Sequence, residues 1–184
     1  MSPFIYPGVL AFYTLSNAAW AGSTLLITGA AGYLGTLVLA ELVSERQFDG
    51  QIIAIDIREV PPSRRLAGVH YLCQDLRSSQ FFSILNDHRV GTVVHLAAIV
   101  TPPLGMTREQ QFDIEVNGTE NLLQSCLAAG VRKIIVSSSG AAYGYHADNA
   151  ILLTEAHPLR GNREFAYAYH KTQLESIALD TVRS

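Results

Sequence analysis

Short apolar runs alternate with longer amphipathic segments along most of the chain. Five of these runs are rich in branched residues and bounded by turn-forming or polar residues, which is typical of buried parallel strands. They lie at residues 23–27, 51–55, 69–72, 92–96 and 134–136. Helical composition covers 33–43, 80–85 and 107–129, and Gly130 stands where a C-terminal glycine cap belongs. Alternating strands and helices predict an α/β fold with a doubly wound parallel sheet and right-handed crossovers.

Three glycines, Gly29, Gly32 and Gly35, follow the first expected strand and lead into the first expected helix. Without side chains at such a turn, the backbone can approach a phosphate at the positive end of the helix. A glycine triplet alone also fits an ordinary turn. Here the strand, the helix and an acidic residue about twenty positions later supply the context of a dinucleotide site.

That acidic residue is Asp56, at the end of the second expected strand. Its carboxylate is expected to accept hydrogen bonds from the adenosine ribose hydroxyls and to repel a 2′-phosphate, which favours NAD over NADP. Arg58 weakens the preference slightly, because a guanidinium can bind a phosphate in a bidentate fashion. The alternative is that Arg58 is a solvated loop charge. We therefore expect NAD as the cofactor.

Composition limits the remaining function classes. A chain of 184 residues with 48% hydrophobic content can bury the core of one α/β domain. A net charge of −3 gives no reason to expect nucleic acid or an anionic membrane as partner. Cys73 and Cys126 show no disulfide or metal pattern and are expected to be core thiols in a reducing, cytoplasmic compartment. The histidines lack ligand spacing, so no metal is expected.

The first 22 residues carry no charged side chain, and residues 3–15 resemble the apolar region of a signal peptide. No Lys or Arg precedes this stretch, Pro7 and Gly8 interrupt it, and it is too short to span a bilayer. We expect residues 1–22 to be a poorly ordered extension and residues 23–184 to be the nucleotide-binding domain.

Tyr167 and Lys171 are four residues apart in the last expected helix. On a helix this spacing places both side chains on one face, where they can reach one ribose and one substrate oxygen. A tyrosine base near neutral pH needs nearby positive charge, and Lys171 supplies it. A tyrosine and a lysine at this spacing are ordinarily only neighbours on the surface of a helix. Tyr169 competes for the role of base only if Lys171 is ignored. It precedes Lys171 by two residues, and side chains at this spacing on a helix do not face each other.

From about Ser23 onward the chain resembles the extended short-chain dehydrogenase/reductase family, in its NAD-dependent epimerase/dehydratase branch. The resemblance is carried by an ordered series of motifs along nearly all of this region. They are Thr28-Gly29-Ala30-Ala31-Gly32-Tyr33-Leu34-Gly35, Asp56, Asp75-Leu76, His95-Leu96-Ala97-Ala98, Val116-Asn117-Gly118-Thr119-Glu120-Asn121-Leu122, Ser137-Ser138-Ser139-Gly140-Ala141-Ala142-Tyr143-Gly144, and Tyr167 with Lys171.

The resemblance implies a Rossmann domain that forms the N-terminal part of an extended family member. It implies a catalytic triad of Ser139, Tyr167 and Lys171, in which Tyr167 takes a proton while hydride passes to NAD and Ser139 hydrogen-bonds the reacting oxygen. Asp75 and Leu76 would contact the adenine. The implied cofactor-binding residues are Gly29, Gly32, Tyr33, Leu34, Gly35, Asp56, Asp75, Leu76, Ala97, Ala98, Asn117, Tyr167 and Lys171.

Two departures from the family pattern affect these expectations. His170 stands where the family usually has a small residue. The chain also stops near the end of the tyrosine helix, so we expect the sixth strand and the C-terminal substrate lobe of the family to be absent. We expect strand 134–136 to expose an unpaired edge, giving an aggregation-prone or partner-dependent fragment that binds NAD weakly.

The resemblance favours a nucleotide sugar as the small-molecule substrate, while steroid-like and dihydroflavonol-like alcohols remain alternatives. Residues 101–106 and the loop 145–164 are expected to line its pocket. Epimerisation or simple oxidation is favoured over dehydration, because Ser139-Gly140-Ala141 offers no additional acid or base. A homodimer is possible. A non-catalytic NAD-binding protein and an interaction scaffold remain alternatives from other classes.

Overall fold

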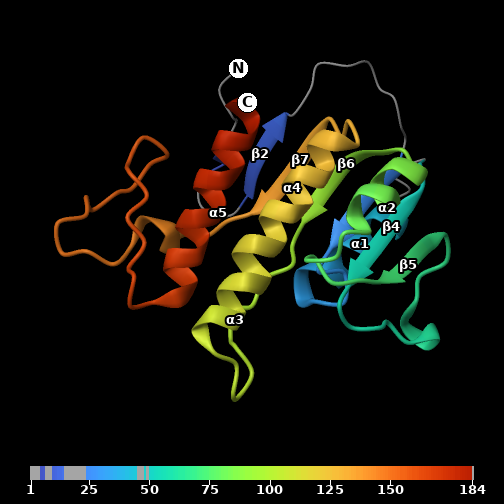
Figure 1. The fold of residues 1–184 in the computed structure, drawn as a ribbon, viewed down its shortest axis with the longest axis horizontal. Helices are drawn as coiled ribbons and strands as arrows, with labels where there is room; N and C mark the ends of the chain where they lie inside the picture. Colours follow the sequence, from blue (N-terminus) through green and yellow to red (C-terminus); the bar gives the residue numbers. More distant parts are fainter. Residues whose placement is uncertain (1–4, 7–9, 15–23, 45–47, 49, 184) are drawn as a thin grey trace.

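The computed structural model describes residues 5–6, 10–14, 24–44, 48 and 50–183. Within these residues, seven strands form one sheet in the order β1-β2-β7-β6-β3-β4-β5 (Figure 1). Their bounds are β1 (Ile5–Tyr6), β2 (Leu10–Thr14), β3 (Thr24–Thr28), β4 (Ile52–Asp56), β5 (Val69–Cys73), β6 (Val90–His95) and β7 (Lys133–Ser137). The strands from β7 to β5 run parallel, which confirms the predicted five-stranded parallel sheet.

Helices cover both faces of this sheet, as a doubly wound fold requires. They are α1 (Tyr33–Ser44), α2 (Phe81–Asp87), α3 (Arg108–Phe112), α4 (Gly118–Ala128) and α5 (Ala166–Arg183), with shorter 3₁₀ turns η1 (Pro62–Arg64) and η3 (Gly140–Tyr143). Figure 1 shows α2, α4 and α5 in front of the sheet, where their buried side chains share one core with the strands. The second core lies on the opposite face and includes Leu39 of α1. Alternate residues of β3 enter the two cores, Leu26 the first and Ile27 the second.

The long helix expected over 107–129 is divided by a π-helical turn. Thr107 caps α3 by accepting from the Gln110 amide, and the Gln110 side chain accepts from the Thr107 amide in return. The π-helical turn η2 (Asp113–Asn117) then joins α3 to α4. After α4 the chain turns at Gly130, whose φ of 71° is the left-handed conformation that a C-terminal glycine cap adopts.

The outer edge of β7 is paired, so the expectation of an exposed edge there is wrong. Strand β2 lies antiparallel to β7 from Leu10 opposite Ser137 to Thr14 opposite Lys133. The N-terminal extension thus supplies β7 with a neighbour on the side away from β6. The predicted poor order of residues 1–22 concerns mostly positions outside the described residues, and there it stays a prediction.

The two cysteines differ in environment. Cys126 is buried in α4, and burial raises the pKa of its thiol to about 12. Cys73 ends β5 and is exposed, so the expectation of a core thiol is wrong for this residue. Its strand is the outermost of the parallel strands, and its Sγ donates to the Ile57 carbonyl. Among the described helices, none combines the length and apolar character needed to cross a membrane.

Candidate nucleotide-binding site

A cavity of about 550 Å³ opens at the carboxyl ends of β3, β4 and β6, where the doubly wound fold predicts its ligand crevice. Its walls come from the glycine turn, the ends of β4 and β5, the loop after β6 and the π-helical turn. The lining residues are Thr28, Gly29, Gly32, Ile55–Arg58, Gln74–Leu76, Leu96–Thr101, Pro103, Met106, Ile114 and Glu115.

The three glycines of the turn have different roles. Gly29 has a φ of 71°, and a Cβ there would lie 2.5 Å from the Ala97 amide nitrogen. A Cβ on Gly35 would overlap the Gly29 carbonyl, so α1 packs directly on the turn. Gly32 lines the cavity at the start of α1, where the first backbone amides of a helix have no intrahelical acceptor. Gly29 and Gly35 therefore build the turn, and Gly32 leaves space for a ligand.

The Asp56 carboxylate is held by its own surroundings. One oxygen accepts from the Ala31 amide at 3.0 Å, and the other accepts from the Arg58 amide at 2.9 Å and from the Arg58 Nε at 3.1 Å. Arg58 is thus an ion-pair partner of Asp56, although its side chain is 66% exposed. The guanidinium also lies beside the Gly32 turn, because a Cβ on Gly32 would lie 3.9 Å from the Arg58 Nη2.

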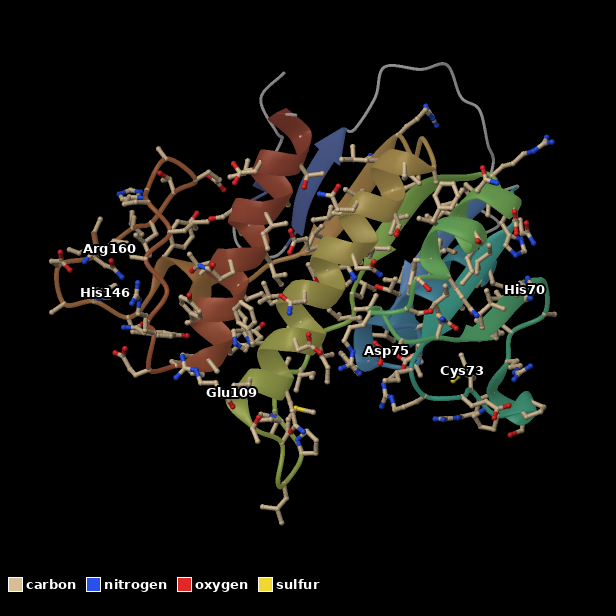
Figure 2. All side chains as sticks on the ribbon, in the orientation of Figure 1. His70, Cys73, Asp75, Glu109, His146 and Arg160 are labelled. Carbon is tan, nitrogen blue, oxygen red and sulfur yellow. The ribbon has the colours of Figure 1, made fainter. Side chains whose placement is uncertain are left out.

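A series of charged side chains begins at Asp75, which lines the cavity and is the residue predicted to contact the adenine. Arg77 donates to the Asp75 carboxylate at 2.6 Å and to the Asp113 carboxylate at 2.8 Å. The Arg77 guanidinium holds the pKa of Asp75 below its usual range. Asn117 donates from its amide to Asp113 and is exposed, and it does not line the cavity. Figure 2 shows Asp75 and Cys73 near each other, far from His146 and Arg160 of the loop 145–164.

The catalytic residues predicted by resemblance lie where α5 packs against the end of β7. The Lys171 Nζ lies 5.7 Å from the Tyr167 ring centre and donates to the Ser137 carbonyl at 2.9 Å. Ser139, two residues after Ser137, caps η3 by accepting from the Ala141 amide. Tyr169 points away and stacks on Phe112.

The structure brings only part of the predicted site to the cavity wall. Seven of the predicted residues line it, namely Gly29, Gly32, Asp56, Asp75, Leu76, Ala97 and Ala98. Tyr33 and Leu34 are exposed at the start of α1. Ser139, Tyr167 and Lys171 are not in the lining, and neither is any residue of the loop 145–164. Residues Thr101, Pro103 and Met106 do line the cavity, as expected for the segment 101–106. The assignment of roles to these residues stays a prediction.

His95 is the last residue of β6, and its buried ring lies between β3 and α4. Its Nδ1 is 2.7 Å from the Thr28 hydroxyl, and its Nε2 is 2.9 Å from the Thr119 hydroxyl. The Thr119 hydroxyl donates its one proton to the Glu115 carbonyl, so it accepts from His95 Nε2–H. Thr28 therefore donates to the bare Nδ1, and His95 is neutral. Burial, followed by the positive charge of Lys171, lowers the pKa of His95 to about 3.

We expect His95 to make the fold sensitive to acid. Its pKa is about 3 in the folded chain and about 6.5 when unfolded, so only the unfolded chain takes up this proton between those values. The stabilisation is complete above pH 6.5 and falls with decreasing pH by about 1.4 kcal/mol per unit, or about 3 kcal/mol between pH 7 and 4. Urea unfolding across this range measures it. His95→Gln should remove this part of the slope, and equal slopes in both proteins would contradict the assignment.

Sequence reasoning missed two buried polar residues beside the cavity, Glu115 and Gln111. The Glu115 carboxylate accepts from the Ile99 amide, the Gln111 amide and His170 Nδ1. A signal was present, because Glu115 lies at helical spacing between the apolar Phe112 and the residues around Thr119. A charged residue on the apolar face of a helix indicates a buried partner.

Comparisons with known proteins identify the family of the chain. The model of the NAD dependent epimerase/dehydratase family matches residues 25–184. A UDP-glucose 4-epimerase of Azospirillum brasilense is 34% identical over 137 residues, which cover 71% of this chain and 37% of that protein. A UDP-glucose 4-epimerase of Halalkalibacterium halodurans is 32% identical over 65% of this chain and 36% of its own length. The chain thus spans well under half the length of these relatives.

Solved structures give the same result. The UDP-Glc/GlcNAc 4-epimerase of Campylobacter jejuni superposes with a TM-score of 0.75 at 25% identity, over 88% of this chain and 50% of that one. A short-chain dehydrogenase/reductase superfamily protein of Agrobacterium tumefaciens with bound NAD gives 0.67 at 30% identity, over 84% and 43%. The predicted fold is confirmed, and the predicted cofactor, NAD, is that of the family. Because the family model covers nearly everything beyond the N-terminal extension, this chain belongs to the NAD-dependent epimerase/dehydratase family of enzymes.

Proposed function

We propose that this chain binds NAD in the cavity at the carboxyl edge of the sheet and acts as an NAD-dependent oxidoreductase or epimerase. The observation that carries the proposal is the combination, in one cavity, of the glycine turn, a helix N-terminus and a carboxylate at the end of the second parallel strand. Ligand-binding clefts of doubly wound sheets use these features for a diphosphate and a ribose.

The lining residues fit the cofactor from one end to the other. Gly32 and the first amides of α1 suit the diphosphate, and Asp56 suits the adenosine ribose. Asp75 and Leu76 provide an acceptor and an apolar surface for the adenine. The backbone of Ala97 packs directly against Gly29, so the cavity wall after β6 lies close to the glycine turn. Bound NAD would supply a hydride acceptor.

Tyr167, Lys171 and Ser139 are proposed to do the acid–base work on the substrate. Tyr167 accepts the proton of a substrate hydroxyl as the carbon loses its hydride. Lys171 stabilises the phenolate through its positive charge and is kept in place by the Ser137 carbonyl. The Ser139 hydroxyl hydrogen-bonds the reacting oxygen. The close packing of α5 on η3, where Thr172 donates to the Ala142 carbonyl, keeps the segments that carry these residues together.

A nucleotide sugar is the proposed substrate class. It is supported by the relatives that are named as UDP-glucose 4-epimerases. Among the neighbours is also an NDP-hexosamine 5,6-dehydratase, TunA, at 27% identity. The serine-rich segment without additional acid or base groups still favours epimerisation or oxidation. A non-catalytic NAD-binding role is the alternative, while a homodimer and a cytoplasmic location stay predictions.

Cofactor selectivity tests the proposed site. In wild type we expect calorimetry to show one NAD site and weaker binding of NADP, because the Asp56 carboxylate repels a 2′-phosphate. Asp56→Asn should reduce the NAD-to-NADP affinity ratio by about tenfold or more, since it removes the negative charge and frees Arg58 for a phosphate.

Arg58→Ala is the matched control, because it removes the positive charge and keeps Asp56. This variant should raise the NAD-to-NADP ratio. A ratio that neither substitution changes, or the absence of NAD binding in the wild-type chain, would contradict the proposed site.

A further inference from the structure

The buried carboxylate of Glu115 has no part in the chemistry proposed above. It belongs to the π-helical turn Asp113–Asn117, and such turns are frequent at functional sites. Its side chain is only 2% exposed. Three donors reach it, the Ile99 amide at 2.8 Å, the Gln111 amide at 3.1 Å and His170 Nδ1 at 2.7 Å. These hydrogen bonds allow a charge to remain in the interior.

Two of the contacts fix the cavity wall after β6. The Glu115 carboxylate accepts from the Ile99 amide, while the Gln111 side chain donates to the Ile99 carbonyl at 3.1 Å. Both backbone groups of Ile99 are therefore held by side chains from the helical segment 108–117. Because Ile99 lines the cavity beyond the end of its strand, these contacts set the position of that wall.

The third contact connects this wall to α5. His170 precedes Lys171 and lies three residues after Tyr167, so the three side chains share one side of the helix. His170 is 1% exposed, and its Nδ1–H donates to Glu115. Its Nε2 is buried with no hydrogen-bond partner among the described residues. An apolar side chain would pack without this unpaired nitrogen, so packing alone does not account for a histidine.

The same carboxylate acts on the charge of Lys171. Burial lowers the pKa of Lys171, while the negative charges of Glu115 and Glu175 raise it. The Tyr167 ring and the neutral His95 also face this ammonium. Glu115 thus lies between two parts of the proposed active site, the cavity wall and the lysine.

We propose that Glu115 and His170 form a positioning pair that holds the cavity wall at Ile99 and the Tyr167–Lys171 segment of α5 in one fixed arrangement. The inference rests on the proposed function, because it assigns the pair to the hydride-transfer site. Neither residue is required to touch the substrate. The pair acts through the Ile99 backbone on one side and through Lys171 on the other.

Four substitutions separate positioning from packing. His170→Leu removes the donor to Glu115, whereas His170→Asn keeps an amide donor near the position of Nδ1 and removes the unpaired nitrogen. Glu115→Gln keeps an acceptor for Ile99 but removes the charge. Glu175→Gln is the matched control, because it removes a charge that acts on Lys171 and does not belong to the Ile99 contacts.

Three measurements follow these variants. Amide hydrogen exchange reports how firmly Ile99 is held, and calorimetry gives the affinity for NAD. The third measurement is the titration of Lys171, followed by NMR with ¹³C-labelled lysine. The chain has two lysines, so Lys133→Arg assigns the signals.

We expect His170→Leu to speed exchange at Ile99 by about tenfold or more and to weaken NAD binding by about tenfold, because a hydrogen bond to a buried charge is lost. His170→Asn should restore both to within about twofold of wild type. Glu115→Gln should lower the titration midpoint of Lys171 and speed exchange at Ile99. Glu175→Gln should lower the midpoint and leave Ile99 unchanged.

The pair would be rejected if His170→Leu left the exchange at Ile99 unchanged, or if His170→Asn were as impaired as His170→Leu. Equal effects of Glu115→Gln and Glu175→Gln on Ile99 would also reject it. If the wild-type chain failed to bind NAD, the proposed function would fall, while exchange and lysine titration would still decide the arrangement. Should Glu115→Gln fail to fold, the two His170 variants decide.

Discussion

If the proposed function holds, Tyr167→Phe is expected to reduce turnover of a nucleotide sugar by about 10²- to 10⁴-fold, the range lost with a general acid–base group. The substitution removes the hydroxyl that exchanges a proton with the substrate and leaves the ring that Lys171 approaches to 5.7 Å. NAD binding should therefore remain within about twofold of wild type, because the cavity lining is unchanged. Turnover is measured with UDP-glucose as the probe nucleotide sugar, and NAD binding by calorimetry.

Tyr169→Phe is the matched control, because this tyrosine stacks on Phe112 instead of facing Lys171. It should retain full turnover. Equal losses in the two variants would mean that the hydroxyl of Tyr167 has no special role. Full turnover by Tyr167→Phe would contradict the role proposed for its hydroxyl, and a wild-type chain that binds NAD without turnover would favour the non-catalytic alternative.

Gly29→Ala is expected to cost about 3 to 5 kcal/mol in the free energy of unfolding, a large part of the stability of a typical domain. Two causes add. An alanine at a φ of 71° is strained, and its Cβ would lie within 3 Å of the backbone of Leu96 and Ala97. Backbone atoms at the end of a central strand cannot move aside as a flexible side chain can. Urea unfolding, or the loss of folded protein, measures the effect.

Gly68→Ala separates these two causes. Gly68 has a φ of 81°, but its Cβ would meet nothing within 4 Å. This variant should therefore lose only about 1 kcal/mol, the cost of the backbone conformation alone. If both variants lost the same free energy, the close approach of the glycine turn to β6 would not contribute to stability.

The parallel sheet was predictable because its strands are short, rich in branched side chains and separated by helices of ordinary length. The expected strand 51–55 is β4 at Ile52–Asp56, and the expected helix 33–43 is α1 at Tyr33–Ser44. Such local patterns are strong when both faces of a strand are buried, as in β3 and β4. The glycine turn was predictable for a similar reason, since its spacing follows from backbone contacts.

Features that depend on distant partners were not predictable from local patterns. Strand β2 pairs with the outer edge of β7, and the apolar N-terminal extension gave no sign of which segment it would join. The π-helical turn at Asp113–Asn117 has no signal in helical periodicity alone. Cys73 was expected in the core because it showed no disulfide or metal pattern, yet it lies exposed at the end of the outermost parallel strand.

The candidate site was predicted in two halves that differ in outcome. The nucleotide half depends on residues at strand ends, and the topology of the sheet brings these ends together in one cavity. The catalytic half depends on α5, which the structure places against β7 and η3 without putting Tyr167 or Lys171 in the cavity lining. The Glu115–His170 contact between the halves joins residues 55 positions apart and could not be inferred from spacing.

The affinity of the chain for NAD, compared between wild type and Gly32→Ala, tests the central claim most directly. Gly32 lines the cavity, and a Cβ there would lie 3.1 Å from the Gly29 carbonyl, so the fold needs to adjust by only a few tenths of an ångström. We predict weak, saturable binding of one NAD in wild type and at least about tenfold weaker binding in Gly32→Ala, with little change in thermal stability. Equal affinities in two folded proteins, or no binding by wild type, would contradict the account.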